Sequence, residues 1–147
     1  MKKKIVAFLL LIIITNCKTN DCEDYACFTP PPMYAFELVD NTTGENIFLN
    51  KILNSNEIRL TNEENKPITF QFISENNLNI ITTEIGWEIG LHSYKLSVGA
   101  NLEIDILLNI KEVHENCCTF FKVIEFQILN YEFEQLNNSE IIKIKID

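Results

Sequence analysis

The sequence predicts an all-β protein, an antiparallel two-sheet β-sandwich of about eight to nine short strands. From Met33 onward, apolar and polar residues alternate with the strand period of two. Turn-forming residues interrupt this alternation at short intervals, and no segment after Met33 carries a capped helical stripe. A strand with one aliphatic face needs a second layer to cover that face, so two packed sheets are favoured over a single open sheet.

Strands are expected where the alternation is clearest. The best case runs from Leu102 to Ile110, with one wholly aliphatic face and one mostly polar face. Turns are expected at 40–44, 76–77 and 137–139, the last of which closes a C-terminal hairpin. Helices of a turn or two are the alternative structure for 47–53 and 113–117. The other strands are expected around residues 36–38, 58–60, 68–72, 78–82, 85–89, 94–98, 121–129, 131–133 and 142–146.

The composition limits the functions that the chain can have. Its 147 residues are 46% hydrophobic, which is enough for one folded domain. The formal net charge is −9, from 12 basic and 21 acidic side chains. A nucleic-acid-binding protein needs a basic surface to neutralise phosphates, so we expect no nucleic-acid partner.

Residues 1–16 have the pattern of a secretory signal peptide. Lys2–Lys4 form a positive n-region, and Ile5–Ile14 is an uninterrupted apolar run of ten residues. As a helix rising about 1.5 Å per residue, this run reaches only about half of a ~30 Å hydrocarbon core. We therefore expect a cleavable signal rather than a permanent membrane span. A short buried core helix is the alternative.

Cys17 follows this apolar run, after Ile14, Thr15 and Asn16. The pattern resembles the lipobox of bacterial lipoproteins, with Asn16 where those proteins usually have a smaller residue. The resemblance implies that the Cys17 thiol carries diacylglycerol, that the chain is cut before Cys17, and that membrane lipid is a partner. Two or three acyl chains hold a protein on a bilayer durably, whereas one chain binds only marginally. A disulfide is the alternative for Cys17.

Residues 17–32 are expected to form a tether, and residues 33–147 the β-sandwich domain. The tether is polar and ends in Pro30–Pro32, which favour an extended, semi-rigid spacer. Residues 1–16 contain three lysines and no acid, so the mature chain keeps 9 basic and 21 acidic side chains, a net charge of −12. A surface of this charge is repelled by anionic lipid headgroups.

Four further cysteines are disulfide candidates, namely Cys22, Cys27, Cys117 and Cys118. An even number in a small exported protein favours disulfides. A bond between the adjacent Cys117 and Cys118 would need a strained ring. We therefore expect the N-terminal segment to be joined to residues 117–118, with Cys27 paired to Cys117 or Cys118. A structural zinc site is the alternative.

The sequence contains no catalytic constellation and no cofactor motif. His92 and Ser93 are neighbours on a predicted strand and should point to opposite faces, so they do not form a nucleophile–base pair. We expect neither enzymatic activity nor a cofactor. Two metal sites are alternatives: His114–Glu115 beside the cysteines, and a calcium loop at 40–45, a segment that we interpret as a hairpin turn.

Trp87 is the only tryptophan and the one candidate ligand-binding residue. It lies in a segment with two glycines, Gly86 and Gly90. We interpret it as a core or rim aromatic at a bulge that the glycines mark. The alternative is an exposed platform for a sugar ring.

The chain as a whole resembles the small surface lipoproteins of Bacteroidota-type bacteria. The resemblance implies a location at the outer membrane or elsewhere in the cell envelope, and it implies no reaction. The features that carry it are Cys17, the entry Cys27–Pro31, the strand Phe36–Asp40 with Thr43–Phe48 after it, and Glu115–Cys118.

Three hypotheses for function follow. The first is a lipid-anchored, non-enzymatic binding or structural module of the envelope. The second is a glycan-binding accessory lipoprotein that uses Trp87 and nearby aromatic residues. The third is an enzyme or inhibitor whose site the sequence does not reveal. The partners expected are membrane lipid through Cys17 and either a glycan or an envelope protein.

Overall fold

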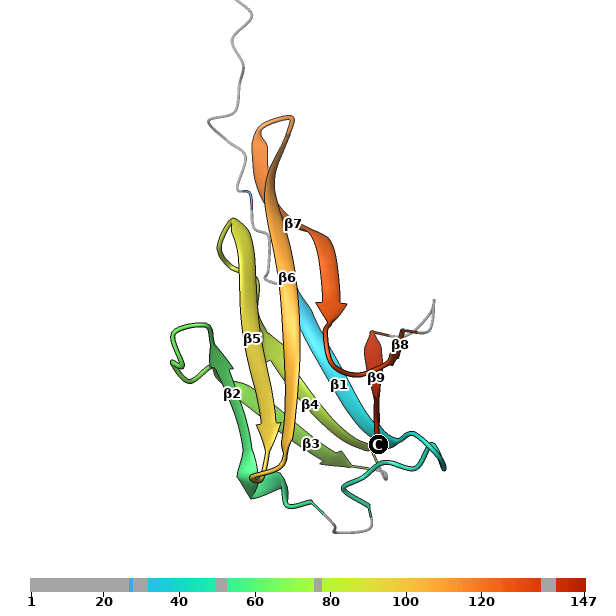
Figure 1. Ribbon diagram of the computed structural model, residues 1–147. Helices are drawn as coiled ribbons and strands as arrows, with labels where there is room; N and C mark the ends of the chain where they lie inside the picture. The colour runs from blue at the N-terminus through green and yellow to red at the C-terminus, as the bar shows by residue number, and fades with distance from the viewer. Residues whose placement is uncertain (1–26, 28–31, 50–52, 76–77, 136–139) are drawn as a thin grey trace, which may run out of the picture.

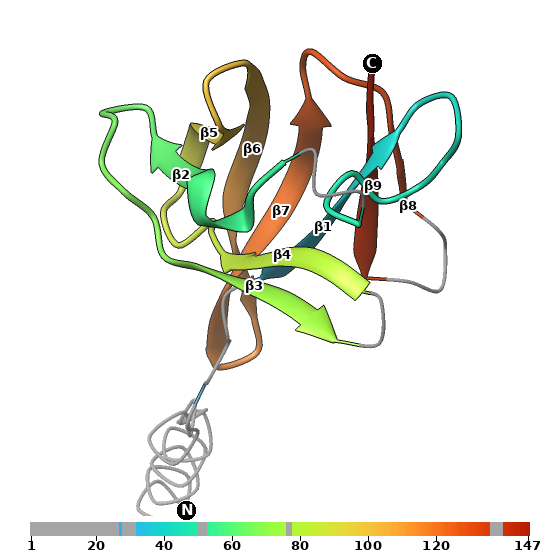
Figure 2. The same ribbon diagram turned by 90° about the horizontal axis from the view of Figure 1, so that it is seen from below.

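A computed structural model describes residue 27 and residues 32–49, 53–75, 78–135 and 140–147. Within these ranges, nine strands form two sheets that face each other (Figures 1 and 2). One short 3-10 helix precedes the second strand. No helix in the same ranges is long and apolar enough to cross a bilayer. The elements are β1 (Met33–Asp40), η2 (Ser55–Glu57), β2 (Ile58–Asn62), β3 (Phe70–Glu75), β4 (Leu78–Glu84), β5 (Gly90–Val98), β6 (Leu102–Glu115), β7 (Cys118–Ile128), β8 (Phe133–Gln135) and β9 (Ile141–Ile146).

The two sheets confirm the predicted β-sandwich. The five-stranded sheet has the order β3-β4-β1-β9-β8, and the four-stranded sheet has the order β2-β5-β6-β7. The described strands pair antiparallel except for β1 and β9, which run parallel from Ala35 opposite Ile141 to Asp40 opposite Ile146. These two strands come from opposite ends of the domain, so no tight turn has to join them and a parallel pair is accessible.

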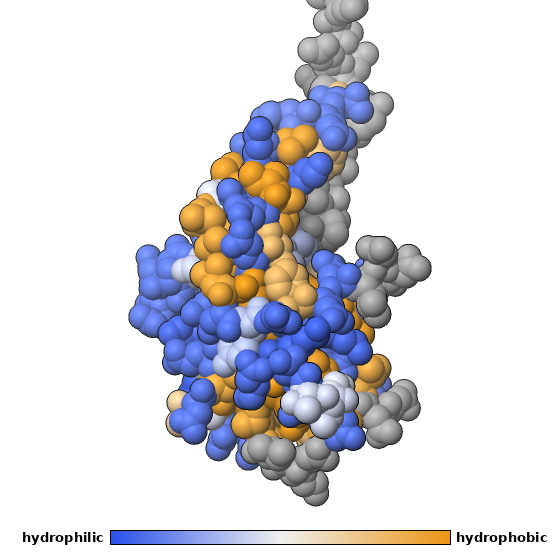
Figure 3. Space-filling model, turned by 45° about the vertical axis from the view of Figure 1, so that its right-hand side comes forward, coloured by the Kyte–Doolittle hydropathy of each residue, from blue (hydrophilic) through white to orange (hydrophobic). Residues whose placement is uncertain are grey.

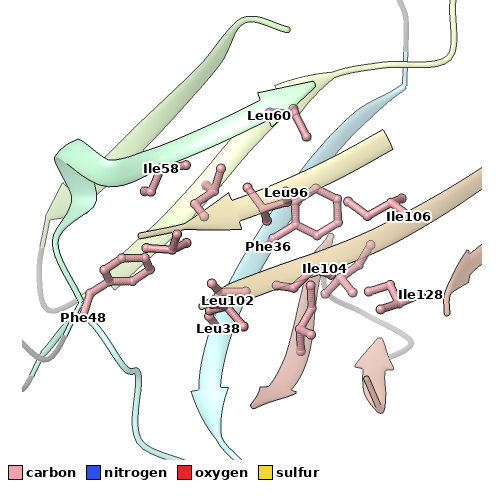
Figure 4. Packing of buried hydrophobic residues seen from close by; sticks show 14 residues of the cluster. Phe36, Leu38, Phe48, Ile58, Leu60, Leu96, Leu102, Ile104, Ile106 and Ile128 are labelled. Carbon is pink, nitrogen blue, oxygen red and sulfur yellow. The ribbon is translucent and has the colours of Figure 1, made fainter. Parts of the chain in front are cut away.

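The main core fills the space between the sheets (Figure 4). In strand β6, every second residue from Leu102 to Ile110 is buried, as the alternation of apolar and polar residues predicts. Leu102, Ile104 and Ile106 share a cluster with Phe36 and Leu38 of β1, which are fully buried in the opposite sheet, whereas Leu108 and Ile110 pack against Ile85. Phe36 also stacks with Tyr34 and Phe126, at centroid distances of 6.1 and 6.5 Å. The alternation thus places an aliphatic layer from each sheet against the other.

One strand prediction was wrong, and neither helical alternative is found in the described parts of 47–53 and 113–117. Residues 85–89 do not continue a strand, because Gly86 and Gly90 adopt φ values of +97° and +117°, which bend the backbone out of the sheet. Residues 113–117 form no helix, because β6 and β7 stay paired as far as Glu115 opposite Cys118. Residues 47–49 form a turn, and the short helix η2 begins later, at Ser55. The predicted turn at 76–77 and the tip of the last hairpin at 137–139 lie outside the described residues.

Candidate functional site

The β6–β7 hairpin extends beyond the rest of the sandwich (Figure 1). Strand β6 has 14 residues and β7 has 11, and they pair up to Glu115 opposite Cys118. The hairpin turn therefore contains only Asn116 and Cys117. Asn116 adopts φ +54°, a left-handed conformation that asparagine tolerates better than most residues. This short turn holds the two adjacent cysteines at the end of a rigid ladder.

A disulfide joins Cys27 to Cys118 across 91 residues of sequence, with the two Cα atoms 5.4 Å apart. One of the two pairings expected for Cys27 is thus confirmed. The Cys27 Sγ atom also lies 3.4 Å from the Cys117 carbonyl oxygen. Cys117 is disulfide-bonded as well. The predicted lipid site Cys17 and the disulfide candidate Cys22 lie outside the described residues. The chain therefore enters the domain at the hairpin tip.

The disulfides at the hairpin tip affect the two metal sites considered there, zinc at the cysteines and a metal at His114–Glu115. Cysteines in disulfides offer no thiolate to zinc. The His114 Nδ1 atom lies 2.8 Å from the Thr119 Oγ1 atom, within hydrogen-bond distance. In the described part of the chain, no group of three or more His, Cys, Asp or Glu side chains is arranged to hold a metal ion. The hairpin tip is thus built around covalent bonds.

The turn after β1 has the structure expected of a hairpin turn rather than a calcium loop. The Asp40 Oδ1 atom accepts hydrogen bonds from the Thr42 and Thr43 backbone N–H groups and from the Thr43 hydroxyl, at 2.7–3.0 Å. These bonds, those from Thr43 first, lower the pKa of the Asp40 carboxyl below its usual value. Gly44 adopts φ +72° and closes the turn. The carboxylate is therefore used within the turn.

Trp87 lies at the rim of a pocket, and its side chain is 56% exposed. The loop that carries it is held by Ile85, which is buried against Leu108 and Ile110. The pocket has a volume of about 520 Å³, within the range of small-molecule sites. Its polar and apolar lining includes Met33, Phe70, Gln71, Thr82, Glu84 and Trp87. The arrangement offers an aromatic face beside amide, hydroxyl and carboxylate groups.

A smaller pocket of about 170 Å³ also reaches Trp87 and is lined by Glu63, Glu88, His92 and Tyr94. Glu63 organises part of it. Its Oε2 atom accepts a 3.1 Å hydrogen bond from the Ser93 backbone N–H, and its Oε1 atom lies 3.7 Å from the His92 Nδ1 atom. The Glu63 carboxylate thus contacts both the His92 ring and the Ser93 backbone N–H.

Two partly buried tyrosines, Tyr34 and Tyr94, pack against the cluster that holds the Trp87 loop. Burial, and secondarily the nearby Tyr94, raises the pKa of Tyr34 to about 12. Burial also raises the pKa of Tyr94, as do the charges of Glu63 and Glu88, against a hydrogen bond to the Gly86 backbone. Both phenols are therefore protonated at neutral pH, and the Tyr34 ring stacks on Phe126 at 5.4 Å. The sequence alone does not connect these tyrosines with Trp87, because β1 and β5 belong to different sheets and only the packing of the two sheets brings them and the 85–89 loop together.

The chain matches no known protein family, no curated protein and no solved structure. Its function must therefore be argued from its own residues.

Proposed function

We propose that this protein is a lipid-anchored, non-enzymatic lipoprotein of the cell envelope that acts as a binding or structural module. The observation that carries the proposal is the disulfide between Cys27 and Cys118. Disulfides persist in exported proteins and are rare in the reducing cytosol. This bond supports export, as the signal-like residues 1–16 predict, and the lipobox-like Cys17 supplies the anchor.

The proposal also assigns a role to each of the remaining cysteines. The chain has five, and Cys27, Cys117 and Cys118 are in disulfides. The proposal assigns Cys22 as the partner of Cys117, which leaves Cys17 as the one cysteine without a disulfide. That cysteine is the one at the lipobox position. An outer-membrane location follows from the resemblance to Bacteroidota-type lipoproteins, and an envelope protein is the expected partner.

Fractionation of cells that express Cys17→Ser tests the anchor, with Cys22→Ser as the matched control. Cys17→Ser should release the protein from the membrane fraction, whereas Cys22→Ser should stay with the membrane and lose one disulfide. Intact-mass analysis should show loss of residues 1–16, lipid on Cys17 and two disulfides in the wild type. Unchanged membrane retention of Cys17→Ser would refute the anchor.

A second candidate function, glycan binding, is favoured by the exposure of Trp87 over its pocket. A sugar ring stacks its C–H face on an aromatic side chain, and neighbouring amide and carboxylate groups bind its hydroxyls. Gln71 and Glu84 line the same pocket as Trp87 and offer these groups.

Polysaccharide pull-down with Trp87→Ala tests this second function. Leu91→Ala is the control, because Leu91 is equally exposed, at 59%, and lines none of the pockets described here. Trp87→Ala should abolish binding and leave the unfolding midpoint nearly unchanged, whereas Leu91→Ala should retain binding. Binding that survives Trp87→Ala would contradict a glycan site at this residue.

A further inference from the structure

Two lysines on the β6–β7 hairpin face each other and form no ion pair with any residue that the structure describes. Lys111 of β6 lies directly opposite Lys122 of β7, and both side chains are exposed. Like charges at directly opposed strand positions repel. The other lysines of the described ranges each form an ion pair with a glutamate: Lys66 with Glu64, Lys95 with Glu103, Lys143 with Glu37, and Lys145 with Glu134. Lys111 and Lys122 form none within those ranges, so the pair is suited to an external anion.

Two exposed aliphatic side chains, Leu91 and Ile124, lie near this lysine pair. Strand register places Leu91 opposite Asn109, two residues before Lys111 on the same face of the sheet, and Leu91 is 59% exposed. Ile124, 54% exposed, is the extra residue at the β7 bulge beside Lys122. Figure 3 shows apolar residues gathered along the part of the molecule that carries the hairpin. We call Leu91, Lys111, Lys122 and Ile124 the hairpin surface. It combines cations with exposed aliphatic groups, as surfaces that bind the lipid interface do.

The outer end of the hairpin also differs in net charge from the whole chain. Residues 111–122 contain two lysines and two glutamates and so have no net charge, whereas the chain carries −9. The nearest other acid on this face, Glu125, has its Oε1 atom hydrogen-bonded to the Gln127 side chain at 2.7 Å. An anionic bilayer repels the acidic chain as a whole but does not repel residues 111–122.

The position at which the chain enters the domain indicates that the hairpin surface faces a bilayer. Cys27 is bonded to Cys118, at the end of the same hairpin. Cys17 precedes Cys27 by ten residues, which span at most about 35 Å when fully extended. If Cys17 is lipidated, as the proposed function states, the bilayer lies within that reach of the hairpin tip. The hairpin surface lies on the hairpin whose end is bonded to this entry segment, so it is placed to meet the headgroups.

We propose that the hairpin surface lies against the headgroup layer of the bilayer that anchors the protein. Lys111 and Lys122 contact lipid phosphates, and Leu91 and Ile124 reach the boundary of the acyl chains. The inference rests on the proposed lipid anchor and adds an orientation to it. The tether alone would leave the domain free to rotate above the membrane, whereas this contact fixes which side faces the lipid.

Tryptophan fluorescence of the full-length lipoprotein tests this orientation. Trp87 is the only tryptophan, so Trp87→Phe gives a silent background for one reporter at a time. The reporter Ile124→Trp is compared with Leu129→Trp, since Leu129 is equally exposed, at 58%, and follows the far end of β7. Each variant is reconstituted into vesicles of phosphatidylethanolamine and phosphatidylglycerol, with and without lipids brominated near the headgroup.

The expected result is a blue-shifted emission that brominated lipid quenches at least twofold more strongly at position 124 than at position 129. Adding Lys111→Gln and Lys122→Gln, or omitting phosphatidylglycerol, should remove most of that difference. Equal quenching at both positions, in protein that floats with the vesicles, would overturn the orientation and leave the anchor intact. A blue shift at 124 that needs protein concentration and no lipid would assign the surface to a second copy instead. Protein that does not float with vesicles would refute the anchor and, with it, this inference.

Discussion

The sandwich body and the β6–β7 hairpin are held by different forces. The body buries an aliphatic layer from each sheet, with Phe36, Leu38 and Ile104 fully inaccessible to solvent. Beyond Ile110 the hairpin has no buried residue in either strand up to Ile128, and a disulfide to Cys27 fixes its end. Where the chain cannot build a core, a covalent bond replaces one.

The largest effect should come from the body. Phe36→Ala removes a fully buried ring that stacks with Tyr34 and Phe126, and should lower the free energy of unfolding by about 3–5 kcal/mol. The matched variant Phe121→Ala, at a hairpin position 41% exposed, should cost less than about 1 kcal/mol. Urea unfolding measures both. Equal losses would show that the hairpin carries as much packing energy as the body.

The disulfide should have the next largest effect. The double variant Cys27→Ser and Cys118→Ser opens a closed loop of 91 residues and should lose about 2–4 kcal/mol. Amide exchange should rise most at residues 111–122, because the body keeps its core. Reduction of the wild type should destabilise at least as much, since Cys117 is released too. An unfolding midpoint that the double variant leaves unchanged would contradict a stabilising role for this bond.

Alanine substitutions at Gly86 and Gly44 compare the stability cost of a side chain in a packed loop with that in an open turn. Gly86, at φ +97°, has Ile110 Cδ1 only 3.0 Å from the place of an added Cβ, so Gly86→Ala should cost about 2–3 kcal/mol. Gly44, at φ +72°, has nothing within 4 Å of that place, and Gly44→Ala should cost about 1 kcal/mol from backbone strain alone. Thermal unfolding ranks the two. A smaller loss for Gly86→Ala would mean that the Ile85–Ile110 contact moves without cost.

The smallest effect concerns the turn far from the hairpin tip. The pKa of Asp40 is lowered in the folded protein, so its stabilising contribution is present above the ordinary aspartate pKa of about 3.9 and is lost as pH falls through the folded value. Asp40→Asn should therefore differ from the wild type in unfolding midpoint at neutral pH and converge with it in acid. NMR titration of the Asp40 carboxyl checks the direction. A difference that grows in acid would reverse the sign of this argument.

The sequence predicted the body far better than the sites. Alternation from Leu102 to Ile110 locates a core strand because burial on one face imposes period two. The parallel pairing of β1 with β9 had no local signal, since it depends on which distant strands meet. Trp87 stands out as the only tryptophan, but the pockets that it shares with Gln71 and with Tyr94 exist only in the folded protein. Lys111 and Lys122 are eleven residues apart, and only the two-residue turn at 116–117 makes them a pair.

The pairing of β1 with β9 also constrains when the protein can fold. Strand β1 lacks one of its two neighbours until β9 has been made, because Ala35 pairs with Ile141 of that strand. Contacts so distant in sequence carry a large loop-closure cost and slow the search for the native state. The five-stranded sheet is therefore completed only after the last strand has been made.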